Sequence, residues 1–460
     1  MDISNLYMPK KSENTVTDEK QAKVIYGGPL FDGKGTVFEN GCIYLSGSTI
    51  LAVGREEDVF PLIPKNKSEL ELIDTQGKVI FPSLINTHHH FFSAYIRGLS
   101  PKGEVTSFEE KLDKLWWPLD KALDEESLQI AALISIMESI ESGVTTIFDH
   151  HSSPSCIRKS LDIIAGAVTK SGINAVLCHE ISDRNGKEKF TEALEENLSF
   201  IENYEGHKNL RGTLGLHANF TLSENSLKII AKEHDPDHGV HIHAGENFSD
   251  FNFAKEIGYE GVIDRLNRFG LISPKAILAH GLYLSEIDLN LLEKHQSLLV
   301  HNPESNANNN LGPFDMENTK RLNVGLGTDG INSNMIQTMR SGFFIHRQKG
   351  MGENLLFEKL SEMLFRNNVA CAQKFFERKL GVLEKGASAD IVIFDYVPFT
   401  PFHENNIYRH LLFGMHDKKA DTVISNGKII FQGGVFISLD KELILEQATE
   451  ISRKVWENYL

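Results

Sequence analysis

The chain has 460 residues, with 47 Lys and Arg against 63 Asp and Glu, a formal net charge of −16, and 19 histidines. The acidic balance argues against nucleic acid or an anionic membrane surface as a partner, because phosphate contacts need clustered basic side chains. The first 20 residues are polar, and no uncharged apolar run reaches about 18 residues. We therefore expect a cytoplasmic protein with no secretory signal and no membrane span. No two of the four cysteines form a CxxC pair, which argues against a disulfide framework and a thiolate zinc site.

Both ends of the chain have the pattern of short β-strands. Residues 1–20 are expected to form a loose tail, and after them short apolar runs alternate with turn residues to about residue 74. The same pattern returns after residue 386. Asn-Gly pairs at Asn40-Gly41 and Asn426-Gly427 are typical of hairpin turns. The ends therefore predict one small β-sandwich domain built from residues 1–80 and 381–460, the latter including a terminal helix.

The middle of the chain, residues 81–380, alternates buried-strand and helix patterns. Eight apolar runs end in polar residues: VIFPSLINTHHH, GVTTIFDHH, INAVLCHE, LRGTLGLHAN, GVHIHAGE, KAILAHG, SLLVHNPESN and NVGLGTDG. Near-continuous apolar runs are typical of parallel strands covered on both faces. Eight such units, without a GxGxxG or P-loop motif, favour a (β/α)₈ TIM barrel over a doubly wound sheet. Residues 91–124, after the first strand, are too long for a simple loop and are expected to cover the barrel mouth.

The strand ends carry the chemistry, because in such a barrel all of them lie on the face where active sites form. His88 and His90 are two residues apart on an extended strand, so their side chains point to the same side. Two imidazoles there suit Zn²⁺ or Fe²⁺, which need at least one more protein ligand and an open position for water. His243 and Asp329, at later strand ends, are the expected further ligands.

For several histidines, the spacing in the sequence does not decide between two roles. His241 stands two residues before His243 and can face the same way, although His243 is nearer the strand end. His89 is expected to face away from the metal. His150 and His151 fit either a pocket wall or a supporting hydrogen bond.

Three residues at the strand ends are candidates for proton transfer. Glu246 follows His243 by three residues and can carry protons beside an activated water. His280 closes the sixth apolar run, where it can hold the attacking water. Asp329 can serve both as a ligand and as a base.

The ordered motifs FPSLINTHHH, HIHAGE, LAHG, HNPESN and GLGTDG resemble the amidohydrolase superfamily. They are most similar to its mononuclear-metal branch of aminohydrolases and chlorohydrolases, and DHHSSP, HEISDRNG and HNPESN resemble the SsnA aminohydrolases within it. The resemblance covers nearly all of residues 22–435. Branches with two metals use a carboxylated lysine at the fourth strand end, where this chain has His217.

The resemblance implies a division of roles among these residues. One divalent ion, Zn²⁺ or alternatively Fe²⁺, would be bound by His88, His90, His243 and Asp329. Glu246, His280 and Asp329 would be catalytic. The residues near the substrate would be His217, Arg184, Asn302, Asn306 and His151.

The predicted function is a metal-dependent aminohydrolase. Activated hydroxide would attack a ring carbon of a small, purine-related nitrogen heterocycle and release ammonia. The alternatives are hydrolysis of a cyclic amide or of a C–Cl bond, and a metal-binding barrel without catalysis. Relatives are often dimers, so a homodimer is expected; the substrate and the leaving group stay open.

Overall fold

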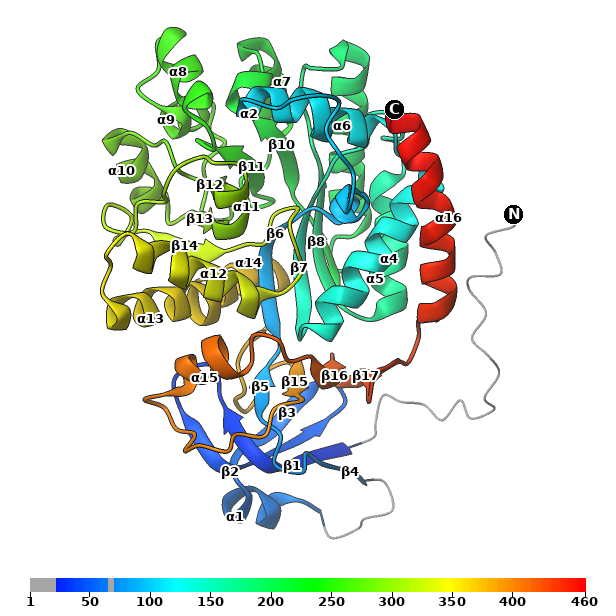
Figure 1. The fold of residues 1–460 in the computed structure, drawn as a ribbon, viewed down its shortest axis with the longest axis vertical. Coiled ribbons are helices and arrows are strands. Elements are labelled where there is room, and N and C mark those ends of the chain that lie inside the picture. The colour runs from blue at the N-terminus through cyan, green and yellow to red at the C-terminus, as the bar shows by residue number, and fades with distance from the viewer. Residues whose placement is uncertain (1–21, 65–69) are drawn as a thin grey trace.

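The computed structural model describes residues 22–64 and 70–460, so the tail predicted for residues 1–20 lies outside the described residues. Within these ranges, eight parallel strands form a closed barrel (Figure 1). They are β6 (Leu84–His89), β7 (Val144–His151), β8 (Asn174–His179), β10 (Leu214–Ala218), β11 (Val240–Ala244), β12 (Ile277–His280), β13 (Leu298–His301) and β14 (Asn323–Leu326). Single bridges between Ile181 and Leu216 and between His89 and Asp329 join the two arcs of strands. The predicted (β/α)₈ barrel is confirmed.

Helices cover the outside of the barrel, which explains why its strands are apolar on both faces. All residues of the strands β6, β7 and β8 are buried. The first long outer helix begins with a capping box formed by Asp124 and Ser127. The outer helices are α4 (Glu125–Glu141), α5 (Ser160–Ser171), α6 (Gly186–Asn203), α7 (Glu224–Glu233), α8 (Phe248–Glu256), α9 (Val262–Arg268), α10 (Glu286–His295), α11 (Pro303–Asn308), α12 (Met335–Gln348), α13 (Glu353–Glu362) and α14 (Asn368–Phe376). The π-helical turn η7 (Met363–Asn367) connects the last two. The short strand β9 (Leu210–Gly212) pairs with β8.

The segment after the first barrel strand forms a helical insert. It contains η4 (Phe91–Ile96), α2 (Phe108–Lys111), the π-helical turn η5 (Leu112–Trp116) and α3 (Trp117–Lys121). The terminal helix α16 (Lys441–Tyr459) lies along α4 (Figure 1), and its Val455 and Tyr459 pack with insert residues in one apolar cluster. The terminal helix therefore packs against the insert whose side chains line the cavity at the barrel mouth.

A separate sheet is built from both ends of the chain. Strand β5 (Ile80–Pro82) pairs with β15 (Ile391–Phe394), which joins the N-terminal strands to the C-terminal ones. The other strands are β1 (Ala22–Phe31), β2 (Val37–Ser46), β3 (Thr49–Arg55), β4 (Leu70–Asp74), β16 (Ala420–Ser425), β17 (Lys428–Gln432) and β18 (Val435–Phe436). Beside them lie α1 (Glu56–Val59), η2 (Phe60–Leu62) and α15 (Ile407–Gly414). This sheet is consistent with the predicted small β-sandwich domain, and the divisions at residues 81 and 381 stay predictions.

The two Asn-Gly pairs have different positions. Asn426-Gly427 forms the turn between β16 and β17, with φ of 51° and 78°, as predicted. The prediction of a turn at Asn40-Gly41 is wrong, because both residues lie inside β2. Gly41 is needed there for close packing, since a Cβ atom would lie 2.1 Å from the Cβ of Leu30 on β1.

Among the described helices, none combines the length and the apolar character that crossing a membrane requires.

Candidate active site

Four predicted metal ligands converge at the mouth of the barrel. Nε2 of His90 lies 3.2 Å from Nε2 of His243 and 3.1 Å from Oδ1 of Asp329. Nε2 of His88 lies 3.8 Å from the same Asp329 oxygen and has no hydrogen-bond partner among the described residues. All four side chains are buried. Strand ends up to 241 residues apart thus bring these side chains together, in the overlapping groups His88–His90–Asp329 and His88–His243–His280.

The hydrogen bonds behind these rings fix the direction of their lone pairs. Nδ1 of His90 donates to the carbonyl of His150 at 2.5 Å, and Nδ1 of His243 donates to the carbonyl of His217 at 2.9 Å. An imidazole that donates through Nδ1 has a lone pair on Nε2, so two lone pairs would face each other across 3.2 Å. Nδ1 of His88 lies 2.9 Å from Nε2 of His241, which can orient the third ring in the same way.

The space between these rings favours positive charge. Burial opposes protonation of His90, but the hydrogen bond and charge of Asp329 raise the pKa of His90 to about 9. Burial also opposes ionisation of Asp329, yet the hydrogen bond and charge of His90 hold the pKa of this carboxyl well below its usual range. A site of this kind accommodates either a proton on His90 or a divalent cation bound by the nitrogen and carboxylate donors, so the residues fit a metal.

The catalytic candidates adjoin the same point. Nε2 of His280 lies 3.6 Å from Oε2 of Glu246 and 3.7 Å from Oδ2 of Asp329. Burial and the charge of Asp329 raise the pKa of Glu246 well above its usual range, so this carboxyl tends to carry a proton. His280 and Asp329 have φ of 77° and 54°, a left-handed conformation that is uncommon outside glycine and recurs at active sites.

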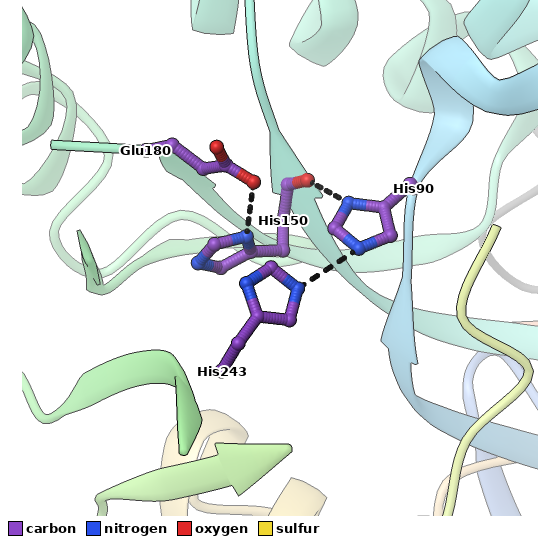
Figure 2. A group of neighbouring side chains, drawn as sticks. All are labelled: His90, His150, Glu180 and His243. Carbon is purple, nitrogen blue, oxygen red and sulfur yellow. Dashed lines mark hydrogen bonds and ion pairs between the residues drawn. The ribbon is translucent and has the colours of Figure 1, made fainter. Parts of the chain in front are cut away.

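A second group of possible ligands shares two of these histidines. Figure 2 shows His90 and His243 beside His150 and Glu180, whose Nδ1 and Oε1 atoms are 3.2 Å apart. Nε2 of His150 lies 3.0 and 3.1 Å from the carbonyls of His241 and Leu216. His150 thus has a close contact at each ring nitrogen, whereas in the described part of the chain Nε2 of His88 has only the 3.8 Å contact with Asp329. Because each Nε2 has one lone pair, His90 and His243 can serve only one ion.

A cavity of about 60 Å³ opens onto these residues. The helical insert forms its roof with aromatic and aliphatic side chains, and the strand ends form its floor. The roof residues are Phe92, Phe108, Leu112, Trp116 and Trp117, and the polar floor includes His90, His217, His243, Glu246, His280 and Asp329. A planar heterocycle matches a pocket of this composition.

A charged cluster forms another part of the cavity wall. The guanidinium of Arg184 contacts Asp120 of the insert and also donates to Oγ of Ser152 at 2.9 Å. Burial raises the pKa of Asp120 to about 6, although the charge of Arg184 acts in the opposite direction. Asp120, Ser152 and Glu180 line the cavity, and Arg184 stands behind them.

Comparison with known proteins identifies the family. Residues 79–430 match the amidohydrolase family. This chain belongs to the amidohydrolase family. It is 27% identical over 404 residues to a 5'-deoxyadenosine deaminase of Methanobrevibacter smithii, covering 84% of this chain and 89% of that protein. It is 28% identical over 425 residues to a 5-methylthioadenosine/S-adenosylhomocysteine deaminase of Carboxydothermus hydrogenoformans, covering 90% and 93%.

Solved structures with the same fold include two deaminases. An adenosine deaminase from Xanthomonas campestris with bound zinc superposes with a TM-score of 0.81 at 19% identity, covering 95% of this chain and 98% of that one. The E. coli guanine deaminase gives 0.74 at 20% identity, covering 89% and 99%. At these identities the likeness is one of fold.

The substrate residues predicted for this amidohydrolase have different positions. His217 lines the cavity, with Nδ1 3.0 Å from Oγ1 of Thr221. The other four do not line it. Asn306 and Asn302 contact Nδ1 of His280 at 2.8 and 3.5 Å, so they lie behind that ring. His151 contacts Ser153 at 2.8 Å, and Arg184 contacts Asp120 and Ser152 of the cavity wall.

The structure adds pocket residues that the sequence analysis did not single out. Glu180 follows the third barrel strand. The expectation that polar residues at strand ends face the active site, which selected His243, could therefore also have found Glu180. His241, an alternative ligand on spacing alone, directs its Nε2 toward Nδ1 of His88 at 2.9 Å. Asp120, Trp116 and Trp117 lie in the insert, where no periodic signal marks the residues that turn toward the cavity.

Proposed function

We propose that this amidohydrolase is a metal-dependent aminohydrolase that attacks a carbon of a purine-like ring and releases ammonia. The observation that carries the proposal is the convergence of three imidazoles and Asp329 beside Glu246 and His280 at the floor of one cavity. The deaminase relatives, which match this chain over most of its length, support the same class of reaction.

The residues proposed to hold the metal are His88, His90, His243 and Asp329. The unpartnered Nε2 of His88 and the two facing lone pairs of His90 and His243 support this set over the one that includes His150 and Glu180. Zn²⁺ is the proposed ion, since three imidazoles and one carboxylate suit it. When bound, it would lower the pKa of a water from about 15.7 to about 7 and so supply hydroxide at neutral pH.

The protein's own groups would move the protons. Asp329 accepts a proton from the attacking water, and His280, held through Nδ1 by Asn306, orients that water. Glu246, whose pKa is raised by burial and by the charge of Asp329, gives a proton to the ring nitrogen next to the attacked carbon, which makes this carbon more electrophilic. A proton then passes to the amino group, which leaves as ammonia.

The test is metal content followed by ammonia release. Protein purified with zinc should contain about one ion per chain and release ammonia from at least one member of a panel of amino-purines, pterins, pyrimidines and triazines. Ring opening or chloride release without ammonia would replace the deaminase proposal by another hydrolase. One ion per chain with no hydrolysis of any kind would favour a binding protein. Membership of the SsnA group stays a prediction.

A further inference from the structure

A second cavity lies between the barrel and the sheet, at the end of the barrel where the strands begin. Its walls are the end of α5, residues 208–209 before β9, the turn between β2 and β3, and the turn between β16 and β17. Figure 1 shows β16 and β17 below α5, far from the barrel mouth. We call it the junction cavity. Its volume of about 620 Å³ lies within the range of roughly 300–1,000 Å³ for pockets that enclose a small organic ligand.

Contacts between the barrel and the sheet hold the walls of the junction cavity in place. Oγ of Ser425 on β16 donates to the carbonyl of Gly172, which follows α5, at 2.8 Å. The two turns also pack closely, since a Cβ atom on Gly427 would lie 1.8 Å from the carbonyl oxygen of Gly47. Backbone from both parts of the molecule therefore fixes the shape of the cavity.

The charged side chains of the junction cavity are basic. Lys170, Lys208 and Lys428 line it, and no Asp or Glu within residues 22–64 and 70–460 does. A further cation, Arg378, lies behind the wall and donates to Oδ1 of Asn426 at 2.5 Å. The whole chain carries a net charge of −16, so this concentration of positive charge is local. A cavity lined by one sign of charge attracts ligands of the opposite sign, here anions.

Two side chains of this cavity lack full compensation for their burial. Burial lowers the pKa of Lys170, although the charge of Asp440 acts in the opposite direction. An anion in the cavity would favour the charged form of this lysine. Oδ1 of Asn209 is buried and has no hydrogen-bond donor among the described residues. Because an unpaired buried oxygen is costly, a hydroxyl group of a ligand would stabilise this wall.

The remaining wall is apolar. Ile429, Ile430 and Ile437 line it, and Ile437 is 61% exposed. A flat or aliphatic part of a ligand could cover Ile437 and remove this side chain from water. Anion, hydroxyl and apolar contacts therefore adjoin one another in a cavity of ligand size.

We propose that the junction cavity binds an organic phosphate of nucleotide size. Its phosphate oxygens contact the ammonium groups of Lys170, Lys208 and Lys428. A hydroxyl group donates to Asn209, and the ring covers Ile437. The site is separate from the proposed metal site, because that site lies at the strand ends and the junction cavity lies at the strand starts. The proposal therefore does not depend on the deaminase reaction.

The experiment is a titration of the zinc-loaded full chain, by calorimetry, with ADP, pyrophosphate and adenosine at about 0.15 M salt. ADP carries all three kinds of group, pyrophosphate only the charge, and adenosine only the ring and the hydroxyls. We expect one ADP per chain, bound about tenfold or more tightly than either of the other two. Because the walls belong to both the barrel and the sheet, ADP should also raise the unfolding temperature.

Variants assign the binding to the junction cavity. The double variant Lys208→Glu/Lys428→Glu should weaken ADP binding about 10- to 100-fold, the range for a hydrogen bond to a charged group. The matched control is Lys232→Glu/Lys320→Glu, which changes the net charge equally at side chains that are 83% and 68% exposed and do not line the cavity. It should keep wild-type affinity. Unchanged zinc content and unfolding temperature without ligand show that each variant is folded.

A variant of the apolar wall separates the ring from the phosphates. Ile437→Thr should weaken ADP binding and leave pyrophosphate binding unchanged. It also keeps the proposal testable if the lysine variant misfolds.

Several outcomes would overturn the proposal. ADP fails to bind, or adenosine binds as tightly as ADP, so the lysines recognise no phosphate. Pyrophosphate binds as tightly as ADP, so the site takes inorganic anions. The two double variants lose affinity equally, so the effect is one of net charge. ADP binding disappears when zinc is removed, so the phosphates contact the metal instead. None of these results bears on ammonia release.

Discussion

Glu246 is the residue whose substitution separates proton transfer from metal binding. It lies 3.6 Å from His280, and burial and the charge of Asp329 raise its pKa, which favours the protonated form that a donor to a ring nitrogen requires. We expect Glu246→Gln to retain zinc and to lower kcat about 10²- to 10⁴-fold, the usual contribution of a general acid or base. Metal analysis and ammonia release on the same sample check this expectation.

The matched control for Glu246 is Glu256→Gln. Glu256 is exposed at the end of α8, on the helix that follows Glu246, and it does not line the cavity. Its variant should keep both zinc and kcat. Wild-type turnover in Glu246→Gln would show that the proton reaches the ring by another route.

His241 tests how much the hydrogen bond behind a proposed ligand ring contributes to zinc affinity. Its Nε2 lies 2.9 Å from Nδ1 of His88, and it holds the ring whose opposite nitrogen is proposed to bind the metal. We expect His241→Phe to lower zinc affinity about 10- to 100-fold, as is typical when a hydrogen-bond partner of a ligand is removed. Competition with a chelator measures the change, and His207→Gln, in a loop after α6, is the control. An unchanged affinity would mean that packing alone orients His88.

Residue-scale prediction from sequence depends on where a residue lies in the fold. The strand-end rule selected His88, His90, His243 and Asp329, because a barrel places all strand ends on one face. It could not select Asp120, since the insert has no period that relates its residues to the cavity. It also could not tell a cavity residue such as His217 from His151, whose side chain contacts Ser153.

At the scale of elements, the terminal helix α16 holds the roof of the cavity. Nε1 of Trp456 donates to the carbonyl of Tyr95 at 2.9 Å, and the hydroxyl of Tyr459 lies 2.6 and 3.0 Å from the carbonyls of Lys114 and Ser100. The sequence predicted a terminal helix and an insert, but not that they meet. Contacts between segments 345 to 361 residues apart leave no trace in local periodicity.

Removing the Tyr459 hydroxyl should loosen the roof. One hydrogen bond contributes about 0.5–1.5 kcal/mol, so Tyr459→Phe should raise the population of open insert about two- to tenfold. We expect faster proteolysis within residues 97–107 and a higher KM with unchanged zinc content. Tyr259→Phe, which removes an exposed hydrogen bond to Glu224, is the control. If both variants behave alike, α16 does not position the roof.

At the scale of the whole molecule, the strand patterns predicted both the barrel and the sheet formed from the two ends. Buried parallel strands and short turn-bounded strands have different patterns, and the order of these patterns along the chain gives the architecture. The position of Asn40-Gly41 could not be predicted in the same way. A glycine needed for close packing inside β2 and a glycine in a hairpin turn have the same sequence signal.

The barrel closes where β6 meets β14, and there the ladder is incomplete. A single bridge joins this edge, between His89 of β6 and Asp329, which follows β14. The side chain of Asn368 fills the gap: Nδ2 donates to the carbonyls of Ile85 and Leu326 at 2.8 and 2.9 Å, and Oδ1 accepts from the amide of Leu326 at 2.9 Å. The π-helical turn η7 ends just before this residue.

Asn368→Leu should therefore weaken the whole barrel rather than one contact. It leaves buried backbone groups of two strands without partners, each worth about 1–3 kcal/mol, so the free energy of unfolding should fall by about 3 kcal/mol or more. Because β6 also carries His88 and His90, zinc affinity should fall together with stability. Urea unfolding with and without zinc measures both effects, and Asn203→Leu, at the exposed end of α6, is the control. A loss of stability equal to that of the control would show that helices outside the barrel hold β6 and β14 together without Asn368.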